Sequence, residues 1–142
     1  MDADGFTGKT ILLVEDFEDS RLMMKRLLEL CGYRVVEAVD GRQAVSMAQK
    51  ALPDLIIMDL SLPEMDGLAA ARRIRRLDGL GRVPVIALTA FDSEDYYEAA
   101  LAAGCAAFLT KPVDFDQIES LIRQLLAERD GQPRPVVRST AS

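Results

Sequence analysis

The sequence contains no histidine, no tryptophan and only two cysteines among its 142 residues. The absence of histidine excludes Ser-His-Asp and Cys-His catalysis and every histidine-containing zinc site, so a bound metal ion would need oxygen ligands. Cys31 and Cys105 form no Cys-x-x-Cys pair and lie among apolar residues, which is typical of reduced thiols in the core of a cytoplasmic protein. Chemistry in this chain must therefore depend on carboxylates, hydroxyls and basic side chains.

Long apolar runs are also absent. No run approaches the roughly 20 residues that span a bilayer, and the first ten residues lack a signal-peptide pattern. The net charge is −6, from 17 basic and 23 acidic residues. This acidic balance gives little attraction to phosphate backbones or anionic lipids. We therefore expect a cytoplasmic protein that binds neither nucleic acid nor membranes directly.

Short apolar segments rich in β-branched residues alternate with segments of helical period. They predict five strands, at Thr10–Val14, Arg34–Ala38, Leu55–Met58, Pro84–Leu88 and Ala107–Leu109. Three are almost continuously apolar, as in parallel strands that are covered on both faces. The strand starts recur roughly every 20 to 30 residues, which leaves room for one helix in each crossover. The pattern predicts an α/β fold in which a parallel sheet lies between helices.

The helical segments differ in how strongly they should hold the sheet. Apolar residues recur at helical spacing in the first and last helices, at Met24, Leu27, Leu28 and Cys31 and at Ile118, Leu121, Ile122 and Leu125. Two further helices are predicted at 40–50 and 66–76, the second with a basic run, Arg72, Arg73, Arg75 and Arg76, that we expect to be a solvated face. The helix capped by Asp92 or Ser93 is mostly alanine on the side that faces the sheet, so it should be well formed but weakly anchored.

The domain organisation is simple. Residues 9–129 are expected to form one domain, and residues 1–8 and 130–142, which lack periodicity, are expected to be flexible tails. The second tail is too short for an output domain such as a helix-turn-helix, so we expect a stand-alone domain.

Polar residues follow four of the predicted strands: Glu15 and Asp16, Asp59, Thr89 and Lys111. Singly, each could be an ordinary cap or turn residue, but a parallel sheet brings them all to one edge. At about 4 Å and an effective dielectric near 20, each pair of carboxylates costs about 4 kcal/mol, a large share of a domain's stability of roughly 5–15 kcal/mol. Mg²⁺, which prefers one or two carboxylates with waters and phosphate oxygens, would offset this repulsion, and Lys111 adds a second positive charge.

Four motifs carry a resemblance to a known family. LLVEDFEDSR, DLIIMDLSLPEMDG, PVIALTA and GCAAFLTKPVD resemble, in order and spacing, the receiver domains of two-component response regulators over about 9–128. The resemblance implies a flavodoxin-like (βα)5 fold with five parallel strands in the order 2-1-3-4-5 between five helices. It also implies a phosphorylation-activated signalling switch rather than an enzyme. The phosphoryl donor would be the phosphohistidine of a sensor histidine kinase or of a histidine phosphotransfer protein, and a downstream protein would be the target.

The resemblance implies a role for each carboxylate. Asp59 would be the phosphoacceptor. Asp16 and Asp59 would bind Mg²⁺ directly, together with the backbone carbonyl of Ser61. Glu15 stands where many members of the family have aspartate, and would act through a metal-bound water.

Further roles concern the phosphoryl group. Lys111 would bind one phosphoryl oxygen as a point charge, while the Thr89 hydroxyl and the Ala90 backbone N–H would hold the others. Ser61 and Phe91 would flank the path of an attacking water and set the lifetime of the phosphoryl group.

The resemblance also implies a conformational switch. Thr89 would be drawn inward on phosphorylation, and Phe108 would occupy the space that Thr89 leaves, although a plain core role for Phe108 stays open. The Lys111–Pro112 bond resembles the family's cis peptide. The weakly anchored alanine helix lies beside this path, so a small input could bias two packings of its surface.

Alternatives remain. A Mg²⁺-dependent phosphohydrolase would also use an aspartate nucleophile, and a phosphorelay intermediate would pass the phosphoryl group on to a phosphotransfer protein. A flavodoxin-like cofactor carrier is disfavoured, because the acidic residues after the first strand would repel a phosphate and the chain has no phosphate-binding glycine motif. A degenerate receiver would lack part of the acid, threonine and lysine set, which is complete here. The oligomeric state, either a monomer or a phosphorylation-dependent homodimer, has no distinct signal.

Overall fold

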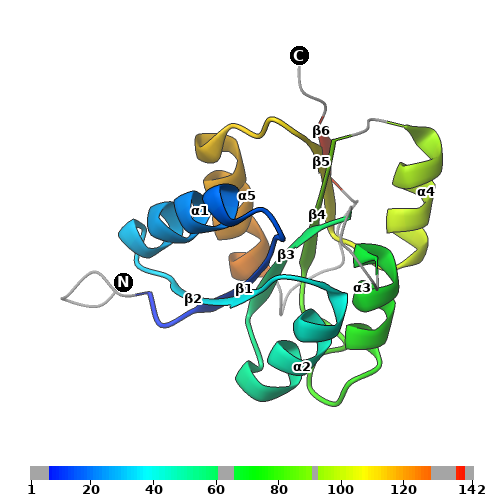
Figure 1. Cartoon of the computed structure of the whole chain (residues 1–142), viewed down its shortest axis with the longest axis horizontal. Coiled ribbons are helices and arrows are strands. Elements are labelled where there is room, and N and C mark those ends of the chain that lie inside the picture. The colour runs from blue at the N-terminus through cyan, green and yellow to red at the C-terminus, as the bar shows by residue number, and fades with distance from the viewer. Residues whose placement is uncertain (1–6, 61–65, 91–92, 129–136, 140–142) are drawn as a thin grey trace.

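A computed structural model of the chain describes residues 7–60, 66–90, 93–128 and 137–139. The strands are β1 (Thr10–Val14), β2 (Arg34–Ala38), β3 (Leu55–Asp59), β4 (Val85–Thr89), β5 (Ala107–Thr110) and β6 (Val137–Ser139). The helices are α1 (Glu18–Leu30), α2 (Gly41–Ala51), α3 (Gly67–Arg75), α4 (Glu94–Ala102) and α5 (Phe115–Glu128). Strands and helices alternate along the chain through α5 (Figure 1). None of the helices among the described residues combines the length and the apolar composition that a membrane span requires.

The sheet is parallel throughout, with the strand order β2-β1-β3-β4-β5-β6. The five predicted strands and their order 2-1-3-4-5 are thereby confirmed. The register aligns Asp59 with Leu88 and Thr89 with Thr110. The carboxyl ends of β3, β4 and β5 therefore meet at one edge, the place where open parallel sheets bind ligands.

β6 corrects one expectation. Residues 130–142 were expected to be a flexible tail, but Val137–Ser139 pairs in parallel with β5. The segment is short, shows no alternation and follows a stretch rich in proline and glycine, so periodicity gives no strand signal there. A sheet edge offers unpaired N–H and C=O groups to any extended segment that reaches it, which is a tertiary effect.

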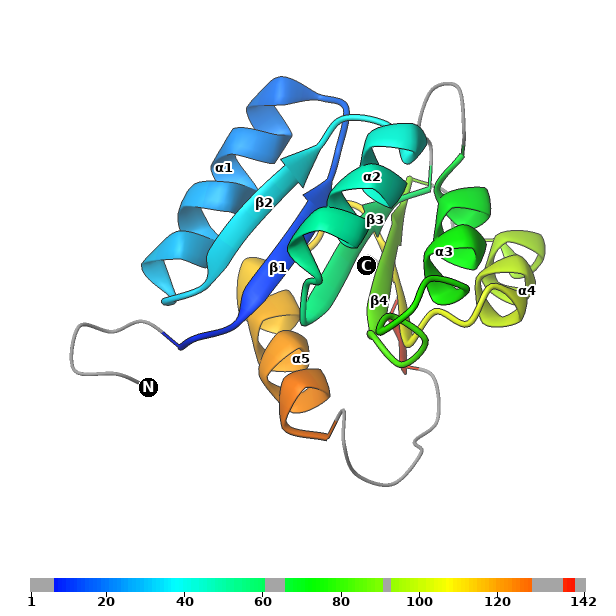
Figure 2. The ribbon, with the colours of Figure 1, turned by 90° about the horizontal axis from the view of Figure 1, so that it is seen from below.

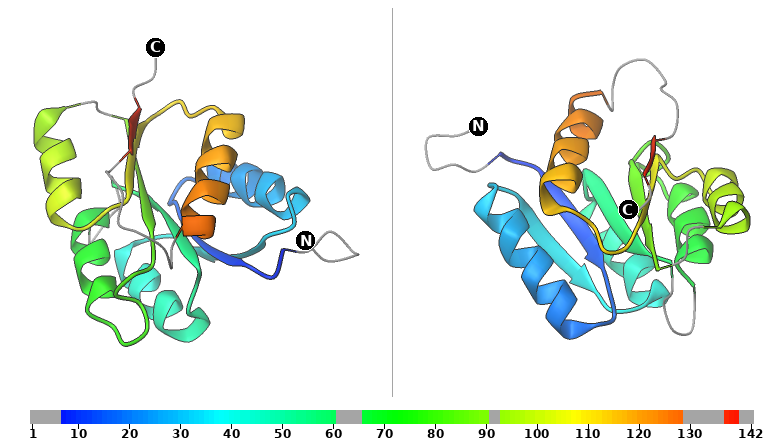
Figure 3. Two further views of the ribbon diagram at one scale, coloured as in Figure 1. Left: turned by 180° about the vertical axis from the view of Figure 1, so that it is seen from behind. Right: turned by 90° about the horizontal axis from the view of Figure 1, so that it is seen from above.

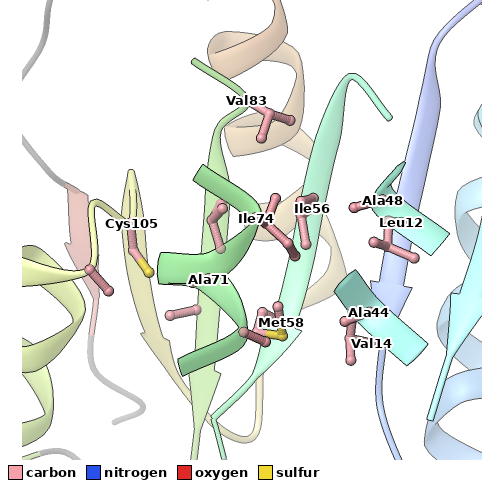
Figure 4. Packing of buried hydrophobic residues seen from close by; sticks show 14 of the residues in the cluster. Leu12, Val14, Ala44, Ala48, Ile56, Met58, Ala71, Ile74, Val83 and Cys105 are labelled. Carbon is pink, nitrogen blue, oxygen red and sulfur yellow. The ribbon is translucent and has the colours of Figure 1, made fainter. Parts of the chain in front are cut away.

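The two faces of the sheet are packed differently. α2, α3 and α4 cover one face, and α1 and α5 cover the other (Figures 2 and 3). On the first face the helices contribute mainly alanines, such as Ala44, Ala48 and Ala71, which pack on Leu12, Val14, Ile56 and Met58 (Figure 4). On the second face they contribute larger side chains, among them Leu28, Ile118 and Ile122. Small side chains let α2 and α3 approach the strands closely but bury little apolar area per residue.

Side-chain caps fix where three helices begin. The carboxylates of Asp40 and Asp66 accept from the backbone N–H groups of Gln43 and Ala69, and the Ser93 hydroxyl accepts from the N–H of Tyr96. Ser93, rather than Asp92, is thus the cap of α4. Such caps satisfy N–H groups that the first helical turn leaves without partners.

Arg75 corrects a second expectation, that the basic run of α3 is a solvated face. Arg72, Arg73 and Arg76 are exposed, but the Arg75 guanidinium turns back to the backbone. It donates to the carbonyls of Gly81 (2.7 Å), Val83 (3.4 Å) and Gly104. Arg75 therefore ties the end of α3 to the turn between α4 and β5.

Gly104 makes that tie possible. Its φ is +85°, and a Cβ at this position would overlap the Arg75 side chain. Only glycine combines this left-handed conformation with the close approach of the guanidinium.

Candidate functional site

Four of the predicted site residues gather at the carboxyl edge of the sheet. Glu15 follows β1, Asp59 ends β3, Thr89 ends β4 and Lys111 follows β5. Glu15, Asp59 and Thr89 are 7%, 4% and 0% exposed. Polar side chains are seldom this buried unless they are paired or hydrogen-bonded.

The carboxylates lie close together. One oxygen each from Glu15, Asp16 and Asp59 lies within 4.8 Å of the others. The Lys111 ammonium binds two of them, with Nζ 3.0 Å from Asp59 Oδ2 and 3.2 Å from Glu15 Oε1. The predicted convergence of the acidic pair, Asp59 and Lys111 is thus present in the structure.

Glu15 has a raised pKa in this cluster. Burial, followed by the hydrogen bond to Asp59, raises its pKa from 4.5 to about 7. For Lys111, burial alone would lower the pKa, but the hydrogen bond and charge of Asp59, with those of Glu15, outweigh burial and raise it. One ammonium therefore does not fully compensate the buried acids, since Glu15 still tends to take up a proton. The cluster has the oxygen donors and the excess negative charge that suit a hard divalent cation.

Arg21 is a site residue that the sequence analysis did not single out. Its Nη1 donates to the backbone carbonyl of Glu15 (3.2 Å), and its Nε donates to Glu37 Oε1 (3.0 Å) on β2. Arg21 thus holds the backbone that carries the acidic pair. The available signal was its place within the motif LLVEDFEDSR, five residues after Asp16.

Of the other predicted site residues, some lie within the described part of the chain and two lie outside it. Thr89 is fully buried, and its carbonyl accepts from the Lys111 N–H (2.7 Å); Ala90 is exposed beside it. Phe108 is fully buried in β5 and meets Tyr97 of α4 edge-to-face, with ring centroids 5.7 Å apart. The Lys111–Pro112 peptide bond is cis. Ser61 and Phe91 lie outside the described residues.

A cavity of about 470 Å³ opens beside the cluster. Glu15, Asp59 and Lys111 line it together with apolar residues of α1, of the loop after β5 and of the start of α5, namely Met23, Met24, Leu27, Pro112, Val113 and Phe115. Met23, one of these lining residues, is 65% exposed. The buried acids therefore border an accessible apolar surface.

The fold and this cluster define a class of protein that comparison with known families identifies. The model of the response regulator receiver domain matches residues 11–123. The chain belongs to this family and is a phosphorylation-dependent signalling switch rather than a classical enzyme.

Individual relatives support the assignment. The polar-differentiation response regulator DivK of Brucella anthropi is 33% identical over 120 residues, which are 84% of this chain and 98% of the relative. The receiver domain of a sensor histidine kinase from Pseudomonas aeruginosa PAO1, solved with a magnesium ion in its active-site cleft, is 37% identical with a TM-score of 0.80 over 86% of this chain and all of that one. The chemotaxis protein CheY4 of Vibrio cholerae is 30% identical with a TM-score of 0.78, over 82% and 97% of the two chains.

Proposed function

We propose that Asp59 accepts a phosphoryl group from a phosphohistidine on a partner protein. The observation that carries this proposal is the contact of the Asp59 carboxylate with Lys111 at 3.0 Å, inside the acidic cluster. Glu15 also contacts Lys111, but it follows β1, whereas Asp59 ends β3 at the centre of the five predicted strands. Asp16 is exposed. Asp59 thus combines burial, a cationic neighbour and a place at the end of a central strand.

The chemistry needs little from the chain beyond positioning and charge. An Asp59 oxygen attacks the phosphorus, the P–N bond to the donor imidazole breaks, and the imidazole leaves with the electron pair and takes up a proton. The product is an aspartyl phosphate. Lys111 would move its ammonium to a phosphoryl oxygen, while the Thr89 hydroxyl and the Ala90 N–H would bind the others. Preorganised charge of this kind supplies most of the catalysis in phosphoryl transfer.

The cluster would hold Mg²⁺ for this reaction. Asp16 and Asp59 would bind the ion directly, with the backbone carbonyl of Ser61, and Glu15 would act through a water. The donor set, the residual charge and the magnesium ion in the Pseudomonas relative support this assignment. When bound, the ion neutralises charge on the transferring group.

The apolar surface beside Asp59 would receive the donor. A histidine of the partner must approach the cavity from outside, where Met23, one of the lining residues, is exposed. Contact with Met23 would bury apolar area next to the reacting atoms, so docking and alignment would occur together. The partner would be a sensor histidine kinase or a histidine phosphotransfer protein in the cytoplasm.

The response would run from Thr89 to α4. Thr89 drawn toward the phosphoryl group would leave space for Phe108, which already contacts Tyr97 on α4. Ser61 and Phe91 would set the phosphoryl lifetime. A downstream protein would read the altered surface; alternatively, the chain would pass its phosphoryl group to a phosphotransfer protein, a role favoured by its similarity to a receiver domain of a sensor kinase.

The test of the acceptor is direct labelling. Acetyl phosphate with Mg²⁺ should add one phosphoryl group to the wild-type chain, observed as a mass gain in intact-protein mass spectrometry. Asp59→Asn should show none, whereas Asp19→Asn, which changes an exposed carboxylate of α1, should be labelled like wild type. Labelling of Asp59→Asn to the wild-type extent would reject Asp59, and release of phosphate from many small esters would favour a phosphohydrolase.

The test of the metal site uses pH. Because the pKa of Glu15 is about 7 in the folded chain and ordinarily 4.5, the metal-free fold binds the extra proton. Protonated Glu15 therefore contributes fully to the stability of the metal-free fold below about pH 4.5, and this contribution is lost as the pH rises to about 7. Mg²⁺ competes with that proton. The affinity of the chain for Mg²⁺, measured by isothermal titration calorimetry, should therefore increase as the pH rises from about 4.5 to about 7.

Glu15→Gln serves as the control for this titration. It should flatten both pH dependences, because the amide does not titrate. Equal slopes in Glu15→Gln and wild type would show that another group is responsible.

A further inference from the structure

The outer edge of β5 is closed by the chain's own C-terminal segment. β6 pairs in parallel with β5, with Val137 opposite Ala107, Arg138 opposite Phe108 and Ser139 opposite Leu109. It lies between α4 and α5 at the end of the sheet (Figures 1 and 3). The match to the receiver family ends at residue 123. β6 therefore lies beyond the residues that the family model matches.

The backbone shows what this edge offers. The Ala106 N–H donates to Val85 on the β4 side, and backbone groups alternate between the two sides of a strand, so Ala107 and Leu109 turn theirs outward. Arg138, opposite Phe108, then turns its own N–H and C=O toward β5. An edge of this kind binds extended peptides through main-chain hydrogen bonds.

Charge favours the same occupant. Residues 129–142 contain three arginines and one aspartate, a net charge of 3 − 1 = +2, whereas residues 1–128 contain 14 basic and 22 acidic residues, a net charge of 14 − 22 = −8. α4, which flanks the edge, contains Glu94, Asp95 and Glu98 and no basic residue. A basic strand is thus attracted to an acidic body, by an amount that salt will reduce.

We propose that the β5 edge is a strand-binding site for a short basic peptide of the chain's own C-terminal sequence. β6 fills it in cis, and the same segment of a second copy fills it when the cis strand leaves. Three paired residues alone make a weak complex, but the tether presents β6 at a high effective concentration. The exchanged and the closed forms make the same contacts, which is the condition for exchange between identical chains. The proposal does not depend on phosphorylation of Asp59.

The experiment measures binding of a fluorescent peptide of residues 131–142 by anisotropy. A chain of residues 1–128 is a suitable receptor because it contains all the residues that the family model matches. A solved receiver domain, which aligns over its whole length with 86% of this chain, shows that a domain of about this size folds without further segments. We expect this receptor to bind the peptide at least about tenfold more tightly than the full chain, whose edge the tethered strand occupies. A peptide with Arg138→Pro lacks the N–H that faces β5. Its affinity should be at least about fivefold lower than that of the native peptide.

A second receptor, a variant of the full chain, is the control for misfolding of the truncated chain. The full chain with Arg138→Pro should bind the native peptide like residues 1–128, whereas Arg138→Ala, which keeps the backbone donor, should stay closed. A scrambled peptide of identical composition separates strand pairing from charge attraction. Equal binding by the full and the open receptors, binding of the scrambled peptide as tight as the native one, or no binding to either open receptor would overturn the proposal.

Discussion

α4 and α5 flank the same strand but are anchored to it very differently. α5 buries Ile118, Leu121, Ile122 and Leu125, whereas Ala100 is the buried residue within α4. A fully buried leucine or isoleucine side chain contributes about 1.5–3 kcal/mol, and an alanine methyl much less. Apart from the edge-to-face contact of Tyr97 with Phe108, β5 is thus held firmly by α5 and loosely by α4. A change at the carboxyl edge should therefore move α4 and leave α5 in place.

The largest expected effect comes from breaking the firm side. Ile122→Ala should lower the free energy of unfolding by about 2–5 kcal/mol, because it removes buried methyl groups and leaves a cavity. Urea denaturation would measure this loss. Arg123→Ala, which changes an exposed side chain on the next position, should cost less than about 1 kcal/mol. A loss for Ile122→Ala as small as that for Arg123→Ala would mean that α5 is not the firm anchor.

Phosphorylation should sharpen the comparison on the loose side. Modification at Asp59 should change the opening free energy of α4 by about 1–3 kcal/mol, a typical coupling between sites, and that of α5 by much less. Hydrogen exchange with and without acetyl phosphate and Mg²⁺ would report both helices in one experiment. Asp59→Asn is the control and should show no change in either. A larger response in α5 than in α4 would reverse the comparison.

The smallest effect tests how little holds α4. Ala100→Gly should cost about 1 kcal/mol from helix propensity, with little added from its single buried methyl group. Ala102→Gly changes an exposed alanine of the same helix and should cost nearly as much. The two variants can be compared by thermal unfolding. A loss above about 2 kcal/mol for Ala100→Gly alone would show that packing at this alanine matters more than its size suggests.

Local patterns were sufficient for most of the fold. Continuous β-branched runs predicted β1 and β3 because central parallel strands are covered on both faces. Asp40 and Asp66 were recognisable as helix starts because caps act within one turn. β6 was not predictable, since its pairing depends on an open edge about 30 residues away along the chain. Arg75 was misread for the same reason: its partners are carbonyls in other loops.

The site was predictable to the extent that it follows from topology. Parallel strands bring their carboxyl ends together, so Glu15, Asp59 and Lys111 had to converge once the strands were assigned. The depth of their burial, and the shift that it causes in Glu15, needed the three-dimensional packing. Arg21 was missed because it acts through a backbone carbonyl, and no side-chain pattern marks such a contact.

The bond between Arg75 and the Gly104 carbonyl gives α4 a fixed end. Because the turn after α4 is hydrogen-bonded to α3, α4 would rotate about that turn instead of sliding along the sheet. Displacement would then be greatest at Ser93 and Glu94, the end nearest Thr89 and Ala90 in sequence. A partner whose affinity depends on the state of the switch would therefore discriminate best by binding the first turn of α4.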